Sequence, residues 1–174
     1  MSPHYSVPLS RHGKCDSNVI NTEKEHKMNI LNKLKALLLP SEYRKQLDTN
    51  VPESWLVLRK RAYLFAAVPF AEVPNEDYAS TYVKDKIKRM VTAWPIIAEK
   101  GLFLLYYGNV GEWNHHKDKF KVDKTGLKPV ILQSVHFLDP DTGDNYNIRT
   151  NWGPVKFGFC DGVIGRIEAG FQKR

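Results

Sequence analysis

The chain has 174 residues, of which 42% are hydrophobic and 26% charged, and its formal net charge is +7. This length suits one compact domain, and this composition is typical of a globular protein rather than of a disordered chain. The longest apolar runs, Ala62–Ala71 and Gly101–Tyr107, are far shorter than the roughly 20 residues of a membrane-spanning helix, so the sequence excludes a transmembrane protein.

The first 27 residues predict a flexible N-terminal arm. They are polar, contain Pro3, Pro8 and Gly13, and show no sustained hydrophobic period. They also lack the apolar stretch of a signal peptide. We therefore expect residues 1–27 to be an arm and residues 28–174 to form a single α+β domain.

A helix is expected to begin at Met28 and to end before Pro40. Its apolar residues recur at helical spacing, namely Ile30, Leu31, Leu34, Leu37 and Leu38. A second short helix over Glu42–Leu47 would begin after Ser41, a residue type that often caps helices. The two apolar runs that follow, Trp55–Leu58 and Ala62–Val68, fit a helix and a strand equally well.

The next segment, residues 75–94, carries the clearest helical pattern. Asn75 is the expected N-cap, the apolar residues trace one face, and Pro95 ends the helix. Beyond Gly101 the pattern changes to short apolar runs separated by turn residues. Strands are predicted at Leu102–Tyr107, Val130–Leu138, Tyr146–Trp152, Val155–Cys160 and Val163–Phe171. The predicted fold class is α+β, with N-terminal helices (28–50 and 75–94) packed on a C-terminal antiparallel β-meander (102–171).

The positive charge is concentrated in two stretches. Residues 28–61 hold seven basic and three acidic residues, and residues 113–128 hold five and two. Cations neutralise phosphates and aromatic rings stack on bases, so a basic stretch with aromatic residues is typical of nucleic-acid binding. The candidate binding residues are Arg59, Lys60, Arg61, Trp113, His115, His116, Lys117, Lys119, Phe120 and Lys121. An acidic protein surface would suit the same charges, and a solvated loop is the simplest alternative.

Two further interpretations concern the first helix. Its leucine face and lysines over Met28–Leu39 fit peripheral contact with a membrane surface. The arm and this helix together fit a structural assembly component that docks on neighbouring subunits. A leucine face at helical spacing is, however, most often part of the core.

Two weak candidates for chemistry remain. Asp139, Asp141 and Asp144 form half of a calcium-loop pattern, but the spacing lacks the remaining ligands, and a hairpin turn explains the same residues without a metal. Cys160 and His136 fall in predicted strands and could form a thiolate–imidazole pair. The alternative is a buried inert thiol and an exposed histidine. No cofactor is predicted.

The sequence thus favours a non-enzymatic binding or accessory protein whose basic surface contacts a polyanionic partner, either nucleic acid or an acidic protein. The alternatives are an assembly component and a small enzyme that uses Cys160 and His136. Two widely spaced cysteines, Cys15 and Cys160, predict free thiols in a reducing cytoplasmic compartment, and one disulfide between them is the alternative. The short, basic chain is also compatible with a phage or mobile-element accessory protein.

Overall fold

The structure is a computed structural model. It describes residues 16–39, 44–45, 51–60, 63–91, 100–123, 130–149 and 158–172. Its helices are α1 (Asp16–Leu38), α2 (Thr81–Val91), α3 (Val110–Trp113) and α4 (Gly158–Phe171), with 3-10 turns η2 (Phe70–Glu72) and η3 (Lys117–Lys119). Its strands are β1 (Arg44–Lys45), β2 (Leu56–Lys60), β3 (Tyr63–Pro69), β4 (Lys100–Tyr107), β5 (Val130–Leu138) and β6 (Asn145–Arg149).

The strands form one mixed sheet in the order β1-β2-β3-β4-β5-β6. The three central strands, β3, β4 and β5, are parallel to one another. The outer pairs, β1–β2, β2–β3 and β5–β6, are antiparallel. We call the edge at which β3, β4 and β5 begin the amino edge, and the edge at which they end the carboxyl edge. Because β2 and β6 run the opposite way, β2 ends at the amino edge and β6 begins at the carboxyl edge.

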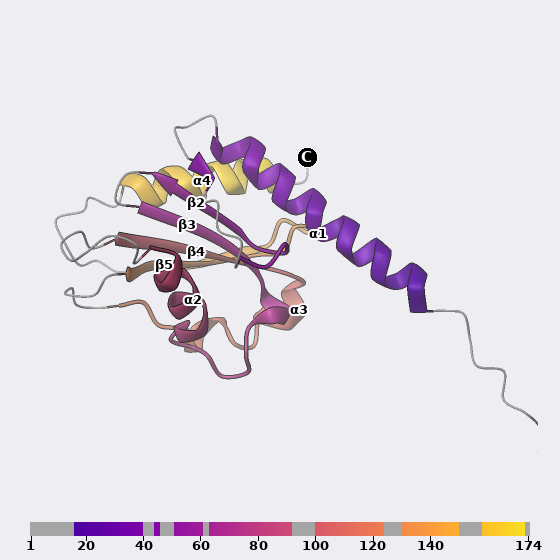
Figure 1. The fold of residues 1–174 in the computed structure, drawn as a ribbon, viewed down its shortest axis with the longest axis horizontal. Helices are drawn as coiled ribbons and strands as arrows, with labels where there is room; N and C mark the ends of the chain where they lie inside the picture. The colour runs from indigo at the N-terminus through magenta and orange to yellow at the C-terminus, as the bar shows by residue number, and fades with distance from the viewer. Residues whose placement is uncertain are drawn as a thin grey trace, which may run out of the picture.

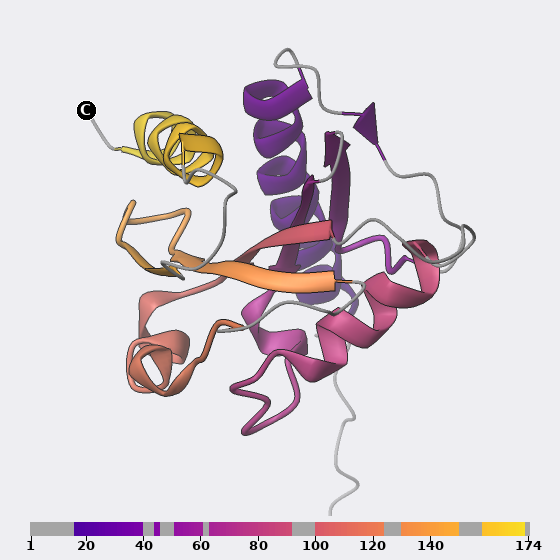
Figure 2. The same cartoon turned by 90° about the vertical axis from the view of Figure 1, so that its left-hand side faces the viewer.

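Helices cover both faces of this sheet (Figures 1 and 2). On one face, α1 and α4 bury apolar residues such as Leu34 and Ile167 against Phe65, Phe103 and Leu105 of the central strands. On the other face, α2 and α3 lie over a second core. The central strands are buried on both faces, as parallel strands usually are, and this explains their nearly continuous apolar sequences.

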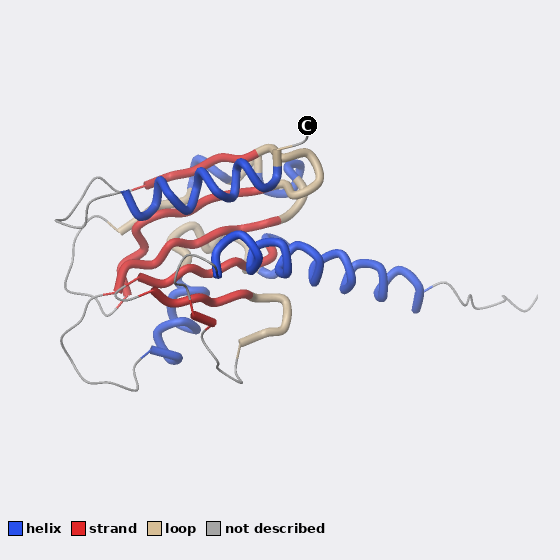
Figure 3. Tube along the Cα trace, turned by 90° about the horizontal axis from the view of Figure 1, so that it is seen from above, coloured by secondary structure: helices blue, strands red, loops and turns tan. Residues whose placement is uncertain are grey.

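The prediction of an α+β fold is confirmed, but the predicted arrangement is wrong in two respects. The sheet is mixed rather than purely antiparallel, and helices and strands alternate along the chain instead of forming two separate blocks. Parallel neighbours need a long crossover connection, and α2 supplies one between β3 and β4, as the views in Figures 2 and 3 show. The segment from Gly108 to residue 129 supplies the next between β4 and β5.

Two predicted element types are also wrong. The segment Val163–Phe171, predicted as a strand, belongs to α4. Its buried residues are Val163, Ile164, Ile167 and Phe171, a helical spacing that the glycines between them obscured. Gly170 is one of these glycines, and a Cβ atom there would lie 2.5 Å from Leu37 of α1, so it allows close packing of the two helices.

The N-terminal half shows similar differences. Helix α1 begins at Asp16, twelve residues before the expected start at Met28, so part of the predicted arm, residues 16–27, is helical. Residues 1–15 lie outside the described part. The predicted helix Glu42–Leu47 contains the short strand β1 instead. The two ambiguous runs are the strands β2 and β3.

Helix α2 is shorter than the predicted 75–94, and residues 92–99 are outside the described ranges. Its N-terminus is capped by Asp77, not by Asn75. The Asp77 carboxylate accepts hydrogen bonds from the backbone N–H groups of Thr81 (2.8 Å) and Tyr82 (3.0 Å). A carboxylate at this position accepts hydrogen bonds from backbone N–H groups that have no partner within the helix, and its negative charge is stabilised by the positive end of the helix dipole.

Candidate functional site

The amino edge of the sheet brings together basic residues that are distant in the sequence. Arg59 and Lys60 are the last residues of β2, and Lys100 is the first residue of β4. Arg59 lies two residues after Val57, and Lys100 lies two residues before Leu102; Val57 and Leu102 belong to the α2-side core. Because residues two apart on a strand point to the same face, Arg59 and Lys100 belong to the α2 face of the sheet.

Helix α2 adds charge to the same end of the molecule. It begins beside the carboxyl edge, where Ser80 Oγ accepts a hydrogen bond from Tyr106 Oη (2.9 Å), and it runs back toward the start of β4. Its last turn carries Lys88 and Arg89, and both side chains are exposed. The amino edge therefore presents basic side chains from β2, β4 and α2.

The charges of Arg59 and Lys100 affect each other. The pKa of Lys100 is lowered, first because the side chain is partly buried and second because the positive charge of Arg59 is close. A neighbouring cation disfavours a second positive charge, whereas a bound anion would relieve the repulsion. Burial and the charge of Arg59 thus both disfavour the charged form of Lys100.

The aromatic residues of the predicted binding loop belong to the core. Trp113 is 2% exposed, stacks on Phe137 with ring centroids 5.6 Å apart, and donates from Nε1 to the carbonyl of Gly108 (3.1 Å). Phe120 is 5% exposed and lies 5.0 Å from the Phe137 ring. Neither ring can stack on a nucleic-acid base unless it leaves this core.

The polar residues of the same loop are partly engaged within the molecule. His116 stacks on Tyr78, and Lys117 donates to Asn114 Oδ1 (2.6 Å) and lies 4.9 Å from the centre of the Tyr146 ring. The Lys119 ammonium lies 5.5 Å from the Tyr78 ring centre. The side chains of His115 and Lys121 are exposed.

The structure separates the two halves of the predicted basic surface. Arg59 and Lys60 lie at the amino edge, whereas Trp113 and Lys117 follow the end of β4 at the carboxyl edge. A strand of seven residues spans roughly 20 Å, so these groups do not form one continuous cluster. Arg61 lies outside the described residues.

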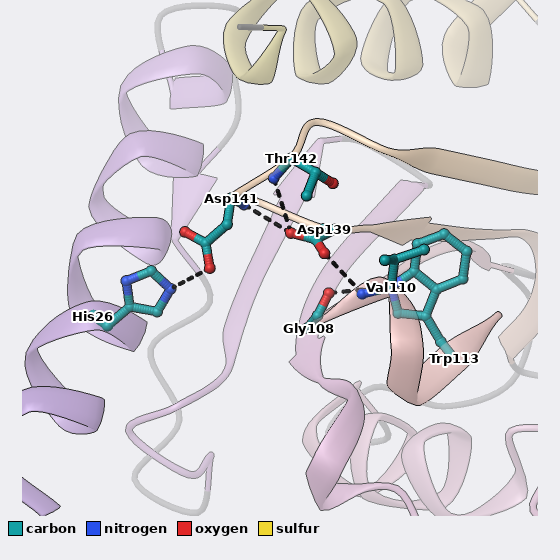
Figure 4. A network of polar contacts seen from close by, with 7 residues as sticks. All are labelled: His26, Gly108, Val110, Trp113, Asp139, Asp141 and Thr142. Atoms are coloured by element: carbon teal, nitrogen blue, oxygen red, sulfur yellow. Dashed lines mark hydrogen bonds and ion pairs between the residues drawn. The ribbon is translucent and has the colours of Figure 1, made fainter. Parts of the chain in front are cut away.

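Figure 4 shows how the carboxyl edge is organised around Asp139, which follows β5. Its carboxylate accepts hydrogen bonds from the backbone N–H groups of Val110 (2.7 Å), Asp141 (2.8 Å) and Thr142 (3.1 Å). Burial alone would raise the pKa of Asp139, but these hydrogen bonds hold it below its usual value. Asp139 thus fastens the start of α3 to the β5–β6 turn.

The other two acids of the predicted calcium-loop pattern have partners within the protein. Asp141 lies 3.6 Å from the imidazole of His26 on α1, and Asp144 accepts a hydrogen bond from Thr142 Oγ1 (2.9 Å). Among the described residues, no group of three metal-binding side chains is close enough to hold an ion. The turn predicted at these residues is present between β5 and β6.

His136 lies in the interior of the sheet rather than on an exposed face. Its side chain is fully buried. Among the described residues, neither ring nitrogen has a hydrogen-bond partner, nor does the hydroxyl of the nearby Ser134. Burial lowers the pKa of His136 to about 4. Cys160 belongs to α4 and not to the predicted strand, and its side chain lies outside the described part, so the Cys160–His136 pair stays a prediction.

The leucine face of α1 packs into the core. Ile30, Leu31, Leu34 and Leu38 are each at most 5% exposed. A docking or membrane-facing role for this face would require these side chains to leave the core. In the described ranges, no helix combines the length and apolar character needed to cross a bilayer.

Sequence reasoning missed Lys100, Lys88 and Arg89. They lie in a stretch, residues 62–112, whose net charge is slightly negative, so a segment-by-segment count hides them. The available signal was that Lys88 and Arg89 end a helix and that Lys100 begins the next strand. In a crossover connection the end of the helix and the start of the following strand lie at the same edge of the sheet.

Searches of protein-family models, of curated proteins and of solved structures returned no match to this chain.

Proposed function

We propose that this chain is a non-enzymatic binding protein whose basic amino edge contacts a polyanion, with nucleic acid as the leading candidate. The observation that supports the proposal is the closeness of Arg59 and Lys100 on one face of the sheet, where burial and then the charge of Arg59 lower the pKa of Lys100. Lys88 and Arg89 extend the positive surface along α2. Phosphate groups neutralise such charges and displace counterions.

This proposal differs from the sequence-based one in the role of the aromatic residues. Because Trp113 and Phe120 are buried, binding would use the phosphate backbone and not base stacking. We therefore expect little dependence of affinity on nucleotide sequence.

The test compares charge-neutralised variants from the two edges. Binding of labelled DNA would be measured for the double variant Arg59→Gln/Lys100→Gln and for the matched variant Lys117→Gln/Lys119→Gln. We expect the first to weaken binding at least tenfold and the second to change it little. The opposite pattern would assign the contact to the loop and contradict the amino-edge proposal. If polyglutamate binds in place of DNA, the partner is an acidic protein.

A further inference from the structure

A cavity of about 300 Å³ lies at the carboxyl edge, between α1 and the start of β2. One wall is formed by α1 and the other by the segments that lead into β2 and out of β3. The lining residues are Glu23, Lys24, Lys27, Met28, Leu31, Glu53, Ser54 and Glu72. Its volume is at the lower end of the range of small-molecule sites, and ligands of proteins with parallel strands often bind at the carboxyl ends of those strands.

The two lysines of the lining are already paired with carboxylates. Lys27 Nζ lies 2.8 Å from Glu23 Oε1, one turn away on α1. Lys24 Nζ lies 3.3 Å from Glu53 Oε2 on the opposite wall. These two ion pairs leave Glu72 as the remaining charged residue of the lining. The lining therefore has one negative charge in excess.

Glu72 is held by uncharged donors. Its Oε2 atom accepts hydrogen bonds from the indole Nε1 of Trp55 (2.8 Å) and from the hydroxyl of Ser54 (2.9 Å). Within the described part of the chain, no lysine or arginine forms an ion pair with this carboxylate. Its position is thus fixed while its charge is not compensated.

A neighbouring tyrosine supports this arrangement. Tyr107 Oη donates to the carbonyl oxygen of Ser54 (2.6 Å), which fixes the segment that carries the cavity wall. Burial, followed by the charge of Glu72, raises the pKa of Tyr107 well above its usual value, so the phenol stays protonated and keeps this bond. The carboxylate and its supporting groups are therefore preorganised.

We propose that this cavity binds a small organic cation, through an ammonium group at Glu72 and an apolar body against Met28 and Leu31. The apolar side chains of α1 exclude water from one side of the ligand, and the carboxylate supplies a charge-assisted hydrogen bond. A volume of about 300 Å³ suits a compact amine. This proposal is independent of the polyanion contact at the amino edge.

The test uses three molecules of similar shape and different charge: phenethylamine, phenethyl alcohol and phenylpropanoate. The indole N–H resonance of Trp55, which reports directly on Glu72, would be followed by NMR during titration of the full chain. We expect saturable shifts with the amine at a concentration at least tenfold lower than with the alcohol, and none with the anion. N-acetyl-lysine amide tests the second source of an ammonium group, the side chain of a partner protein; tighter binding than that of phenethylamine would identify it.

Variants make the result specific. Glu72→Gln keeps an acceptor for Trp55 and Ser54 but removes the charge, and we expect it to weaken amine binding at least tenfold. The matched control, Glu25→Gln, removes a carboxylate from the same region of α1 without touching the cavity lining and should change nothing. Met28→Lys, at a position that is 37% exposed, tests the site without disturbing the Glu72 contacts, and its ammonium should abolish binding. Equal binding of the amine and the alcohol, or no effect of Glu72→Gln and Met28→Lys, would overturn the proposal.

Discussion

At the carboxyl edge the carboxylate of Asp139 accepts three backbone hydrogen bonds, whereas at the amino edge the ammonium of Lys100 lies close to a second cation, Arg59. The first arrangement stabilises a charge inside the protein and lowers the pKa of the acid. In the second, burial of Lys100 and then the positive charge of Arg59 lower the pKa of the lysine. The carboxyl edge thus uses its central charge to stabilise the fold, whereas at the amino edge burial and the nearby Arg59 make the charge of Lys100 unfavourable for stability.

Such a cost is typical of functional surfaces, where residues that bind a partner are not optimal for stability. The two edges should therefore differ in how substitutions change the free energy of unfolding. Substitutions at the carboxyl edge should destabilise the fold, and neutralisation at the amino edge should not.

The largest effect is expected from Trp113→Ala. The substitution removes a buried ring that stacks on Phe137 and donates to Gly108, and such changes cost about 3–5 kcal/mol. Urea unfolding measures the loss, with His115→Ala, a substitution at a neighbouring exposed residue, as the control. A loss below about 1 kcal/mol would mean that Trp113 is not a core residue. The ring would then again be a candidate for contact with a partner.

The next largest effect concerns pH and His136. Its pKa is about 4 in the folded protein because the ring is buried, whereas an unfolded histidine titrates near 6.5. The unfolded chain therefore binds more protons between these values, so stability is complete above about pH 6.5 and is lost as the pH falls toward 4. The full loss is about 3 kcal/mol.

His136→Leu separates this loss from the titration of the acids. The variant should lack the His136 part of the pH dependence, so it should be more stable than the original chain at low pH, where the unfolded histidine takes up a proton that the buried ring does not. Urea unfolding at pH 7 and at pH 4.5 compares the two proteins. Identical pH dependence in both would show that His136 is accessible to protons in the folded state.

A smaller loss is expected from Asp139→Ala, which leaves three backbone N–H groups without their acceptor. Hydrogen bonds to charged groups contribute about 1.5–3 kcal/mol each. Because contributions within one network are not additive, we expect a total loss of about 2–3 kcal/mol. Asp139→Asn retains an acceptor oxygen and should lose less. Because the pKa of Asp139 is lowered on folding, its contribution should disappear as the pH falls below about 4. Equal stability of Asp139→Ala and the original chain would refute the role of this residue in joining α3 to the β5–β6 turn.

The smallest effect is expected at the amino edge. Lys100→Gln removes one of two repelling charges, so the free energy of unfolding should stay the same or rise by a few tenths of a kcal/mol, most clearly at low salt. The matched variant at the other edge, Lys117→Gln, loses its ion–ring contact with Tyr146 and should fall by about 0.5 kcal/mol. A clear loss of stability in Lys100→Gln would show that this lysine has a structural role.

The sequence predicts those elements whose signal is local. Strands β4 and β5 are confirmed over Leu102–Tyr107 and Val130–Leu138, where turn residues close to the apolar runs favoured strands over helices. The segment of α4 was misassigned since its glycines resemble turn residues, although they allow contact with α1 at Gly170. The parallel pairing of β3, β4 and β5 could not be predicted, because apolar runs do not reveal which strands are neighbours.

The candidate sites show the same limit. Arg59 and Lys60 were identified from the sequence, but their proximity to Lys100 depends on strand order. Glu72 gave no signal at all, since its importance comes from contacts with Trp55 and from the wall supplied by α1. Conversely, the basic and aromatic pattern around Trp113 suggested binding, whereas its rings fill the core beneath α3.

The most direct test of the account is the salt dependence of DNA binding by the original chain and by Arg59→Gln/Lys100→Gln. With double-stranded DNA each phosphate contact contributes about 0.9 to the slope of log K against log salt concentration. If both cations contact phosphates, the variant should bind more weakly and its slope should be smaller in magnitude by about 2. An unchanged affinity and slope, or no binding by either protein at low salt, would contradict the proposal that the amino edge contacts a nucleic acid.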